Sequence, residues 1–597
     1  MGQTIIEKIL SSHASAPVRP GDIADIEIDV RAARDFGGAN VVKNLETAGL
    51  AVADPAKTVF TFDCNPGGSD QGYAANQQRC RQFARRTGVP VRDIDQGIGT
   101  HIAIEDGLVG PGATFVSTDS HANIMGAVGA FGQGMGDQDI AAAWAHGKVW
   151  FKCPPTKKVV LTGRPGPGAT AKDITLKMAA ELGAAGLLGC AAEVYGEAVD
   201  DLGVAERVTI ASMATEMGGI IVLFEPNAAV LEFCRAAGGR DWPAIAADTD
   251  AEYVETIEID IDGLGPMIAR PGHPDDAVAV SDVAGKRVDS VFIGSCTNGR
   301  LDDLRAAANV LRGKHIAPGV VLKVVPSTRK AWARALDEGI IEDLMQAGAL
   351  IGNPGCGGCA AGQIGQNGPG EVTVSSGNRN FAGKQGKGEV FLASPETCAA
   401  TALAGVIATA DAIPEPVGPW QVEAADETRR EYAAPTGAKP TVLKGRVWLV
   451  DVENIDTDMI FHNRHLAITE LAEMGPHTFG NLPGWEDFPG RVQPGDIVVT
   501  GGNFGCGSSR QQAVDCFKAL GVSLLIARSY GAIYERNAIN AGMPVMVADL
   551  LGAGLENGQE ITVDLTTGVI TWDGGEQRGQ RFSDMQVEIY QRGGLLA

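Results

Sequence analysis

The chain has 597 residues, of which 44% are hydrophobic and 79 are glycine, and its formal charge at pH 7 is −24. At about 150 residues per domain it is too long for a single core, and the composition is typical of a globular α/β protein rather than a disordered one. The negative charge disfavours nucleic acid and anionic membranes as partners, and no apolar run approaches the ~20 residues that span a bilayer.

The N-terminal segment and the cysteines predict a cytoplasmic protein. The start, MGQTIIEKILSSH, fits a loose myristoylation pattern but has no signal-peptide core. Ile5-Ile6 and Ile9-Leu10 instead predict an amphipathic helix packed on the body. The cysteines number eleven and are scattered, which argues against a disulfide framework and for a reducing compartment.

Residues 1–410 alternate short β-branched runs with helical stretches rich in Ala and Leu. The expected strands include 58–63, 158–163, 219–224, 290–295 and 320–326, and the expected helices include 139–151, 173–186 and 302–313. This alternation predicts layered α/β subdomains with largely parallel sheets, whose sites lie at the carboxyl ends of the strands.

The composition of the sequence changes after residue 410. Residues 411–440 form a Pro-rich stretch around the charged run AADETRREY, which predicts a connector. Residues 441–597 again contain strand-like runs, at 444–451, 495–501 and 524–530, with helical stretches between them. We therefore expect a large region at 1–410, a connector at 411–440 and a second α/β domain at 441–597.

Three cysteines stand in glycine-rich loops, Cys296 in GSCTNGR and both Cys356 and Cys359 in GNPGCGGC. Buried structural thiols and a zinc site are alternative interpretations, because CxxC alone is a common pattern. Glycines beside all three thiols favour an iron–sulfur cluster, whose sulfides accept backbone N–H groups. A 4Fe–4S cluster used only for electron transfer normally takes four thiolates. Three predict one iron with an open position for Lewis-acid chemistry.

Two further motifs indicate proton transfer and anion binding. Asp119-Ser120-His121 follows the strand-like run ATFVSTD, and a carboxylate bonded to an imidazole suits a proton donor to a leaving hydroxyl. Ser508, Ser509 and Arg510 lie on a glycine-rich turn entering a helix, where backbone N–H groups can stabilise an anion. A plain pair of N-capping serines is the alternative for this second motif.

Several long motifs resemble those of the aconitase / isopropylmalate dehydratase family. They are the two cysteine loops, SSGNRNFAGKQGKG at 375–388, ENIDTDMIFHNRHL at 453–466 and GGNFGCGSSRQQA at 501–513, and the resemblance extends over nearly the whole chain. It implies three-layer α/β/α subdomains around an iron–sulfur cluster, followed by a swivel α/β domain. That domain is a separate small subunit in some members but is fused here, so we expect no separate small subunit to be required.

The resemblance also implies roles for individual residues. It gives a 4Fe–4S cluster held by Cys296, Cys356 and Cys359. The implied catalytic residues are Asp63, His101, Asp119, His121, Glu193 and Ser508, the last as the base that removes the Cα proton. The implied substrate-binding residues are Arg379, Lys384, Ser120, Ser509 and Arg510, with Arg34 and Arg464 as further candidates and the amides of Asn298 and Asn378 near the cluster. Core packing is the alternative for His101, and a solvated charge is the alternative for Arg464.

The sequence departs from the family pattern at three positions. Asp63 is followed by Cys64 where relatives carry a histidine, and a thiol differs from imidazole in pKa and reach. Lys384 stands where relatives carry a second arginine, so the charge remains without the planar fork. Arg34 replaces a glutamine or histidine and could hold an additional carboxylate.

These features predict a hydro-lyase or isomerase that acts on a small hydroxy di- or tricarboxylate. The departures favour a 3-isopropylmalate-type or other alkylmalate dehydratase, with aconitate hydratase or homoaconitase as the alternative. A non-enzymatic alternative is an RNA-binding iron sensor, which the −24 charge and the lack of basic runs disfavour. A simple electron carrier would need a fourth ligand that the sequence does not offer in these loops.

Overall fold

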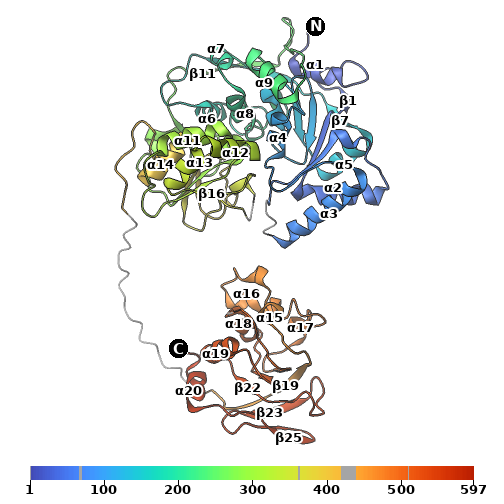
Figure 1. Cartoon of the computed structure of the whole chain (residues 1–597), viewed down its shortest axis with the longest axis vertical. Coiled ribbons are helices and arrows are strands. Elements are labelled where there is room, and N and C mark those ends of the chain that lie inside the picture. The colour runs from blue at the N-terminus through green and yellow to red at the C-terminus, as the bar shows by residue number, and fades with distance from the viewer. Residues whose placement is uncertain (1, 66–69, 361–362, 419–438, 509, 597) are drawn as a thin grey trace. The chain divides into compact units, whose positions relative to one another are not determined.

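The computed structural model describes residues 2–65, 70–360, 363–418, 439–508 and 510–596. The chain divides into two compact units, Met1–Val422 and Glu423–Ala597 (Figure 1). The division falls within 411–440, where the sequence predicts a connector. Residues 419–438 of that connector lie outside the described residues.

The N-terminal helix α1 (Ile5–Ser12) forms as the sequence predicts. Thr4 caps its N-terminus and exchanges hydrogen bonds with Glu7, which satisfies backbone N–H groups that the first turn leaves free. Ile5, Ile6 and Ile9 are fully buried, so the apolar face of this amphipathic helix packs on the core of the first unit.

The first sheet of this unit is parallel and has the strand order β4-β3-β2-β5-β6. Helices α2, α3 and α5 cover one face, where they pack around Phe60 and Trp144. The five strands are β2 (Val30–Arg34), β3 (Thr58–Thr61), β4 (Val91–Arg92), β5 (Thr114–Ser117) and β6 (Phe131–Gly134). Because β2 lies between β3 and β5, the residues that follow these three strands meet at one edge of the sheet.

The second sheet is also parallel, with the order β10-β9-β8-β11. Its core is continuous with residues of the first sheet, and α6 and α8 pack into it. The four strands are β8 (Thr156–Thr162), β9 (Ala191–Tyr195), β10 (Ile221–Phe224) and β11 (Glu255–Asp260).

The third sheet has seven strands in the order β13-β12-β18-β17-β14-β15-β16. Strands β14 to β18 are parallel, and β12 pairs antiparallel at one side. Helices α11, α13 and α14 supply much of its core. The strands are β12 (Met267–Ala269), β13 (Ala277–Ala279), β14 (Ser290–Ile293), β15 (Val321–Val324), β16 (Leu350–Ile351), β17 (Val372–Ser375) and β18 (Glu389–Ala393).

The longer helices of the first unit mostly follow strands, as α/β layering requires. Figure 1 shows α11, α13 and α14 together on the third sheet and α2, α3 and α5 together on the first. The helices after α1 are α2 (Asp35–Ala48), α3 (Gln71–Thr87), α4 (Gly99–Glu105), α5 (Asp137–His146), α6 (Ala171–Leu182), α7 (Glu197–Asp200), α8 (Val204–Ala211), α9 (Ala228–Gly238), α10 (Ser295–Asn298), α11 (Leu301–Leu311), α12 (Arg329–Asp337), α13 (Ile340–Gln346) and α14 (Pro395–Ala404).

The helix expected at 139–151 is wrong in its second part. Helix α5 ends at His146, and Gly147 adopts a left-handed conformation with φ 76°. The segment Lys148–Lys152 is strand β7, which pairs antiparallel with β1 (Ile23–Glu27). Valine and aromatic side chains favour this strand over a continued helix.

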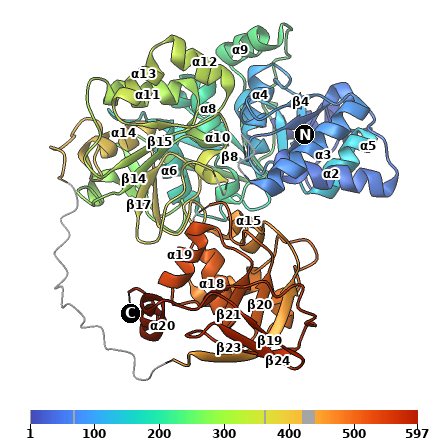
Figure 2. The same ribbon diagram turned by 60° about the horizontal axis from the view of Figure 1, so that its bottom comes forward.

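The second unit contains one mixed sheet with the order β22-β21-β20-β19-β23-β24-β25 (Figure 2). One face packs against α18 and α19 and the other against Tyr590 of α20. Its strands are β19 (Val442–Val450), β20 (Ile497–Thr500), β21 (Leu524–Ala527), β22 (Val545–Val547), β23 (Glu560–Asp564), β24 (Val569–Trp572) and β25 (Gly575–Arg578). Its helices are α15 (Thr457–Ile460), α16 (Leu471–Met474), α17 (Phe488–Arg491), α18 (Gln512–Ala519), α19 (Ala532–Asn540) and α20 (Asp584–Arg592).

Both units are α/β structures, and the fold class expected from the sequence is confirmed. Among the described helices, none combines the length and the apolar character needed to cross a bilayer.

Candidate active site

The three cysteines of the sequence motifs follow strands of the third sheet. Cys296 lies in α10, directly after β14, and Cys356 and Cys359 follow β16. Cys296 and Cys356 are buried together with Ile98, and the half-buried Cys359 packs against them. The structure therefore brings the three thiols into one group.

Unusual backbone conformations place these thiols. Ser295, just before Cys296, is buried and has φ 76°, a conformation that non-glycine residues rarely adopt. Gly357, between the two later cysteines, has φ 59°, and an added Cβ would lie 2.6 Å from Cζ of Phe292. Glycine is thus required at 357 both by its φ and by the close approach of Phe292.

The thiols lie beside the amide of Asn378 and near positive charge. Asn378 Nδ2 lies 3.7 Å from Cys296 Sγ, and Cys359 Sγ lies 3.6 Å from Asn378 Oδ1. Arg34 Nη2 donates to Cys356 Sγ at 2.6 Å. Burial raises the pKa of the Cys296 thiol well above its usual range, so a thiolate there needs a compensating cation or metal. Three grouped thiols with these donors fit an iron–sulfur cluster, the cofactor that the family implies.

Arg34 joins two carboxylates at the edge of the first sheet. Its Nε donates to Asp63 Oδ1 at 2.7 Å, and its Nη1 lies 3.1 Å from Asp119 Oδ1. Burial lowers the pKa of Arg34, but the two carboxylates outweigh that effect and raise it. Each of the three guanidinium nitrogens thus has one contact within the protein, and the role of Arg34 in binding a substrate carboxylate stays a prediction.

The two aspartates that contact Arg34 differ in protonation. Burial raises the pKa of Asp63 to about 6 even though Arg34 opposes the shift. Burial also acts to raise the pKa of Asp119, but Arg34 and His121 outweigh it and lower the pKa. Asp119 is therefore a carboxylate at neutral pH, whereas Asp63 can exchange a proton near pH 6.

His121 lies between the Asp119 loop and two groups from other sheets. Its backbone N–H donates to Asp119 Oδ1 at 3.0 Å, while Nε2 lies 3.2 Å from Glu216 Oε1 and 2.6 Å from Asn378 Nδ2. Arg379 Nε donates to the same Glu216 oxygen at 2.6 Å. This network joins the first, second and third sheets of the unit.

Glu216 is one of two residues of this group that sequence reasoning missed. Burial acts to raise its pKa, but His121 and Arg379 outweigh this and lower it, so the buried carboxylate is charged. The signal available in the sequence is an acidic residue within the otherwise uncharged run ASMATEMGG, just before strand β10. Lys172 was missed as well. It is buried in the first turn of α6, and its Nζ donates to the carbonyls of Ser376 and Gly377, which lead into Asn378.

Glu193, which the resemblance implies to be catalytic, is held by contacts with α1 and with two tyrosines. Glu193 Oε1 accepts the backbone N–H of Ile5 at 2.6 Å, and Oε2 accepts the hydroxyls of Tyr195 and Tyr253 at 2.8 and 2.7 Å. Both oxygens are therefore occupied in fixing α1 to the second sheet.

His101 is buried in α4, and its Nδ1 lies 3.4 Å from Thr100 Oγ1. Burial, aided by the charge of Arg300, lowers the pKa of His101 to about 3. The imidazole is therefore neutral at physiological pH, and its Nε2 contacts no hydrogen-bond partner among the described residues.

The other expected substrate-binding residues of the first unit lie at its surface or are half-buried. Ser120 is exposed, and its Oγ lies 3.3 Å from His121 Nδ1. Lys384 is half-buried, and its charge opposes the rise that burial causes in the pKa of Cys359. Both residues thus border the thiol and histidine group.

Cys64 lies beside this group but cannot exchange a proton near neutral pH as an imidazole does. It is buried, and burial raises its pKa well above the usual range, so the thiol stays protonated at neutral pH. Asp35, Asp63 and Cys64 have ligand atoms within 4.8 Å of one another. However, the Asp35 carboxylate accepts the backbone N–H groups of residues 63–65 and the amide of Gln77, which makes it a structural anchor of this loop.

The second unit carries its own set of expected site residues. Ser508 is exposed, and its carbonyl accepts the Thr457 hydroxyl at 3.1 Å. Arg510 donates to Asp458 Oδ2 at 2.6 Å and to the Phe461 carbonyl at 3.2 Å. Arg464 is exposed beside His465, and Ser509 lies outside the described residues.

Comparison with known proteins identifies the family. The model of the aconitase family (aconitate hydratase) matches residues 7–405, and that of the aconitase C-terminal domain matches residues 454–549. The chain is 40% identical to 3-isopropylmalate dehydratase large subunit 1 of Methanopyrus kandleri over 68% of this chain and 98% of that protein. It is 41% identical to the homoaconitase large subunit of Thermus thermophilus over 70% of this chain and 99% of that protein.

A solved 3-isopropylmalate dehydratase structure from Methanocaldococcus jannaschii is 33% identical to this chain. It covers 26% of this chain and 91% of its own, with a TM-score of 0.25. The fold, the grouped thiols and the family matches define an enzyme of the hydro-lyase class. The chain belongs to the aconitase family and carries the family's C-terminal domain in the same polypeptide.

Proposed function

We propose that this enzyme reversibly removes water from a hydroxydicarboxylate of the 3-isopropylmalate or related alkylmalate type. The observation that carries the proposal is that Asn378 contacts two of the three thiols, those of Cys296 and Cys359, and also His121. This contact joins the proposed cofactor ligands to a proton-carrying side chain. The names of the relatives in Methanopyrus kandleri and Thermus thermophilus support the reaction class.

We infer that Cys296, Cys356 and Cys359 hold a 4Fe–4S cluster. Bound there, a cluster with one iron free of thiolate would supply a Lewis acid for the substrate hydroxyl. The chain itself supplies the positive charge that favours the thiolate forms, because Arg34 contacts Cys356 and both Lys384 and Arg379 act to lower the pKa of Cys359.

His121 is the proposed donor of a proton to the leaving hydroxyl. A protonated imidazole would be stabilised by the Glu216 carboxylate at 3.2 Å, and the Asp119 carboxylate fixes the backbone of His121. Glu216 also orients Arg379 through a 2.6 Å hydrogen bond, so one buried carboxylate positions both the proton donor and a substrate-binding cation.

The cations of the first unit that border the thiol group support the alkylmalate assignment, because there are two of them for two substrate carboxylates. Arg379 and Lys384 border the thiol group, whereas the charge of Arg34 is already balanced by its contacts with Asp63 and Asp119. A third substrate carboxylate left without its charged hydrogen bond would cost about 1.5–3 kcal/mol. Dicarboxylates are therefore favoured over citrate.

Ser508 and Arg510 complete the proposal from the second unit. The glycine-rich loop that carries them resembles the family loop whose serine removes the Cα proton. Arg510 is fixed by Asp458 and the Phe461 carbonyl, which holds a cation close to this loop and would stabilise a deprotonated hydroxyl.

Anaerobic reconstitution with iron and sulfide, followed by an absorbance assay for the unsaturated acid, tests the proposal. Alkylmalates, citrate, isocitrate and homocitrate would be compared by kcat/KM. We expect the highest value for an alkylmalate. A value for citrate or isocitrate that equals or exceeds the best alkylmalate would contradict the substrate assignment, and no dehydration of any member would contradict the reaction.

A further inference from the structure

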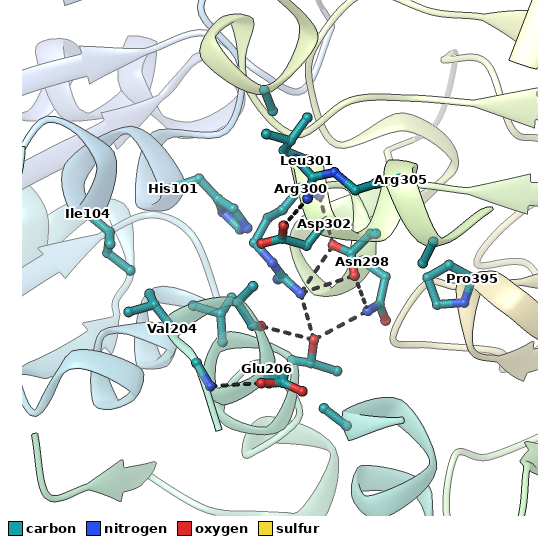
Figure 3. A pocket seen from close by; sticks show the side chains of 18 of the residues that line it. His101, Ile104, Val204, Glu206, Asn298, Arg300, Leu301, Asp302, Arg305 and Pro395 are labelled. Carbon is teal, nitrogen blue, oxygen red and sulfur yellow. Dashed lines mark hydrogen bonds and ion pairs between the residues drawn. The ribbon is translucent and has the colours of Figure 1, made fainter. Parts of the chain in front are cut away.

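The first unit contains a cavity of about 830 Å³ beside the candidate active site (Figure 3). The described residues that line it include His101 and Asn298 but none of the three cysteines. Cavities of this size are large enough for a small organic ligand. Three side chains that the proposed reaction uses, Arg379, Lys384 and His121, do not line it, although His101, which the resemblance implies to be catalytic, does.

The N-terminal turns of five helices border the cavity. They belong to α6, α8, α11, α12 and α14, each of which has eight or more residues. A helix N-terminus carries partial positive charge and free N–H groups, so five together create a potential that favours an anion. Three acids already cap their own helices, since Asp173 accepts the N–H of Thr170, Asp303 that of Arg300 and Glu206 that of Gly203.

Arg300 provides a second and independent indication of an anion. Its residue surface is only 9% exposed, and Figure 3 shows its side chain in the space between His101 and Asn298. Its Nη2 donates to Thr209 Oγ1 at 2.6 Å and lies 3.1 Å from Asp303 Oδ2. Its Nε and Nη1 have no hydrogen-bond partner among the described residues. Buried donors of this kind normally have an acceptor, which a bound ligand would supply.

The remaining wall of the cavity is apolar. Ile104, Val204, Val208, Phe233 and Ala237 line it, so a ligand would combine a charged end with an aliphatic body. Repulsion of an anion is limited, because burial raises the pKa of both Glu105 and Glu396 to about 7, and each is about half neutral at that pH. Asp302 is neutralised by Arg305.

We propose that this cavity is a second ligand site, distinct from the reaction site, that binds a small aliphatic carboxylate. Its carboxylate accepts from Arg300 and the surrounding helix N-termini, and its alkyl group packs on the wall formed by Ile104, Val208 and Phe233. The ligand would contact Asn298, in the same short helix as Cys296, and so would be sensed by the loop that carries that thiol.

Isothermal titration of the reconstituted full-length protein with isovalerate tests this site. We expect saturable binding that Arg300→Gln weakens by about tenfold or more, since a charged hydrogen bond is lost. Arg312→Gln, at the opposite end of the same helix, should leave the affinity unchanged. Arg379→Gln should also leave it unchanged, which separates this cavity from the reaction site.

Three further measurements keep the proposal open to refutation if Arg300→Gln fails to fold. Ala236→Phe, which fills the cavity from α9, should abolish isovalerate binding. The neutral isovaleramide and inorganic phosphate should each bind more weakly than isovalerate. Unchanged affinity in Ala236→Phe or in folded Arg300→Gln, equal binding of isovaleramide, or tighter binding of phosphate would each overturn the assignment.

Discussion

Cys356 differs from the other two proposed ligands because its thiol contacts a buried guanidinium, that of Arg34, at 2.6 Å. We expect Cys356→Ser to abolish both the visible absorption of the reconstituted protein and its activity, since a hydroxyl is a poor ligand for iron. The same change at Cys506, a half-buried thiol of the second unit, should leave the visible absorption intact. Full absorption in Cys356→Ser would show that the ligand assignment is wrong.

Ser508 is exposed in the second unit. Its proposed role, removal of the Cα proton, stabilises the transition state rather than the bound substrate. We expect Ser508→Ala to lower kcat by about 10²–10⁴-fold with little change in KM, because removing a base affects the transition state more than the ground state. Steady-state kinetics on the preferred substrate measure both values. A raised KM with an unchanged kcat would instead make this loop a substrate clamp.

Among elements, the short turn Gly357–Cys359, which follows Cys356 directly, is tightly constrained. Gly357→Ala combines a positive φ of 59° with a contact of 2.6 Å to Phe292, and we expect it to lower the free energy of unfolding by about 2–4 kcal/mol. Urea unfolding measures the change, and iron content after reconstitution should fall with it.

Gly313 is a matched control for this element. It also has a positive φ, of 70°, but an added Cβ there meets no described atom within 4 Å. Gly313→Ala should therefore cost only the backbone strain, about 1–2 kcal/mol, and leave the iron content unchanged. Equal losses of stability in the two variants would contradict the role assigned to Phe292.

At the scale of the whole molecule, buried carboxyls make stability depend on pH. Burial raises the pKa of Glu396 from its ordinary value near 4.5 to about 7, so its ionised form is less stable in the folded than in the unfolded chain. The folded state holds the proton more tightly, and this contribution to stability is lost as pH rises from about 4.5 to 7.

Replacing the Glu396 carboxyl by a neutral amide should remove its contribution to the pH dependence of stability. We expect Glu396→Gln to raise the free energy of unfolding by about 2–3 kcal/mol at pH 8 and to change it little at pH 4.5. Thermal unfolding at the two pH values measures the effect, with the exposed Glu252→Gln as a control that should behave like the parent protein. Stabilisation of the same size at both pH values would show that ionisation is not the cause.

The sequence by itself determined where most helices and strands lie and which side chains offer reactive groups. Local patterns are sufficient for these, because burial and turn chemistry repeat at the period of a strand or helix. The capped helix α1 and the strand-plus-loop that carries Cys296 lie where the sequence predicts them. The helix expected at 139–151 is wrong beyond His146, because the segment after Gly147 pairs with the distant strand β1.

Only the tertiary structure decided which charged residues meet. Glu216 and His121 are 95 positions apart, and Arg34 and Cys356 are 322 apart, so strand order and not local pattern brings them together. The same strand order places Glu193 in contact with α1 and Arg34 in contact with Asp63 and Asp119. A motif names side chains that can do chemistry, but their partners, burial and pKa depend on contacts between sheets that no local pattern encodes.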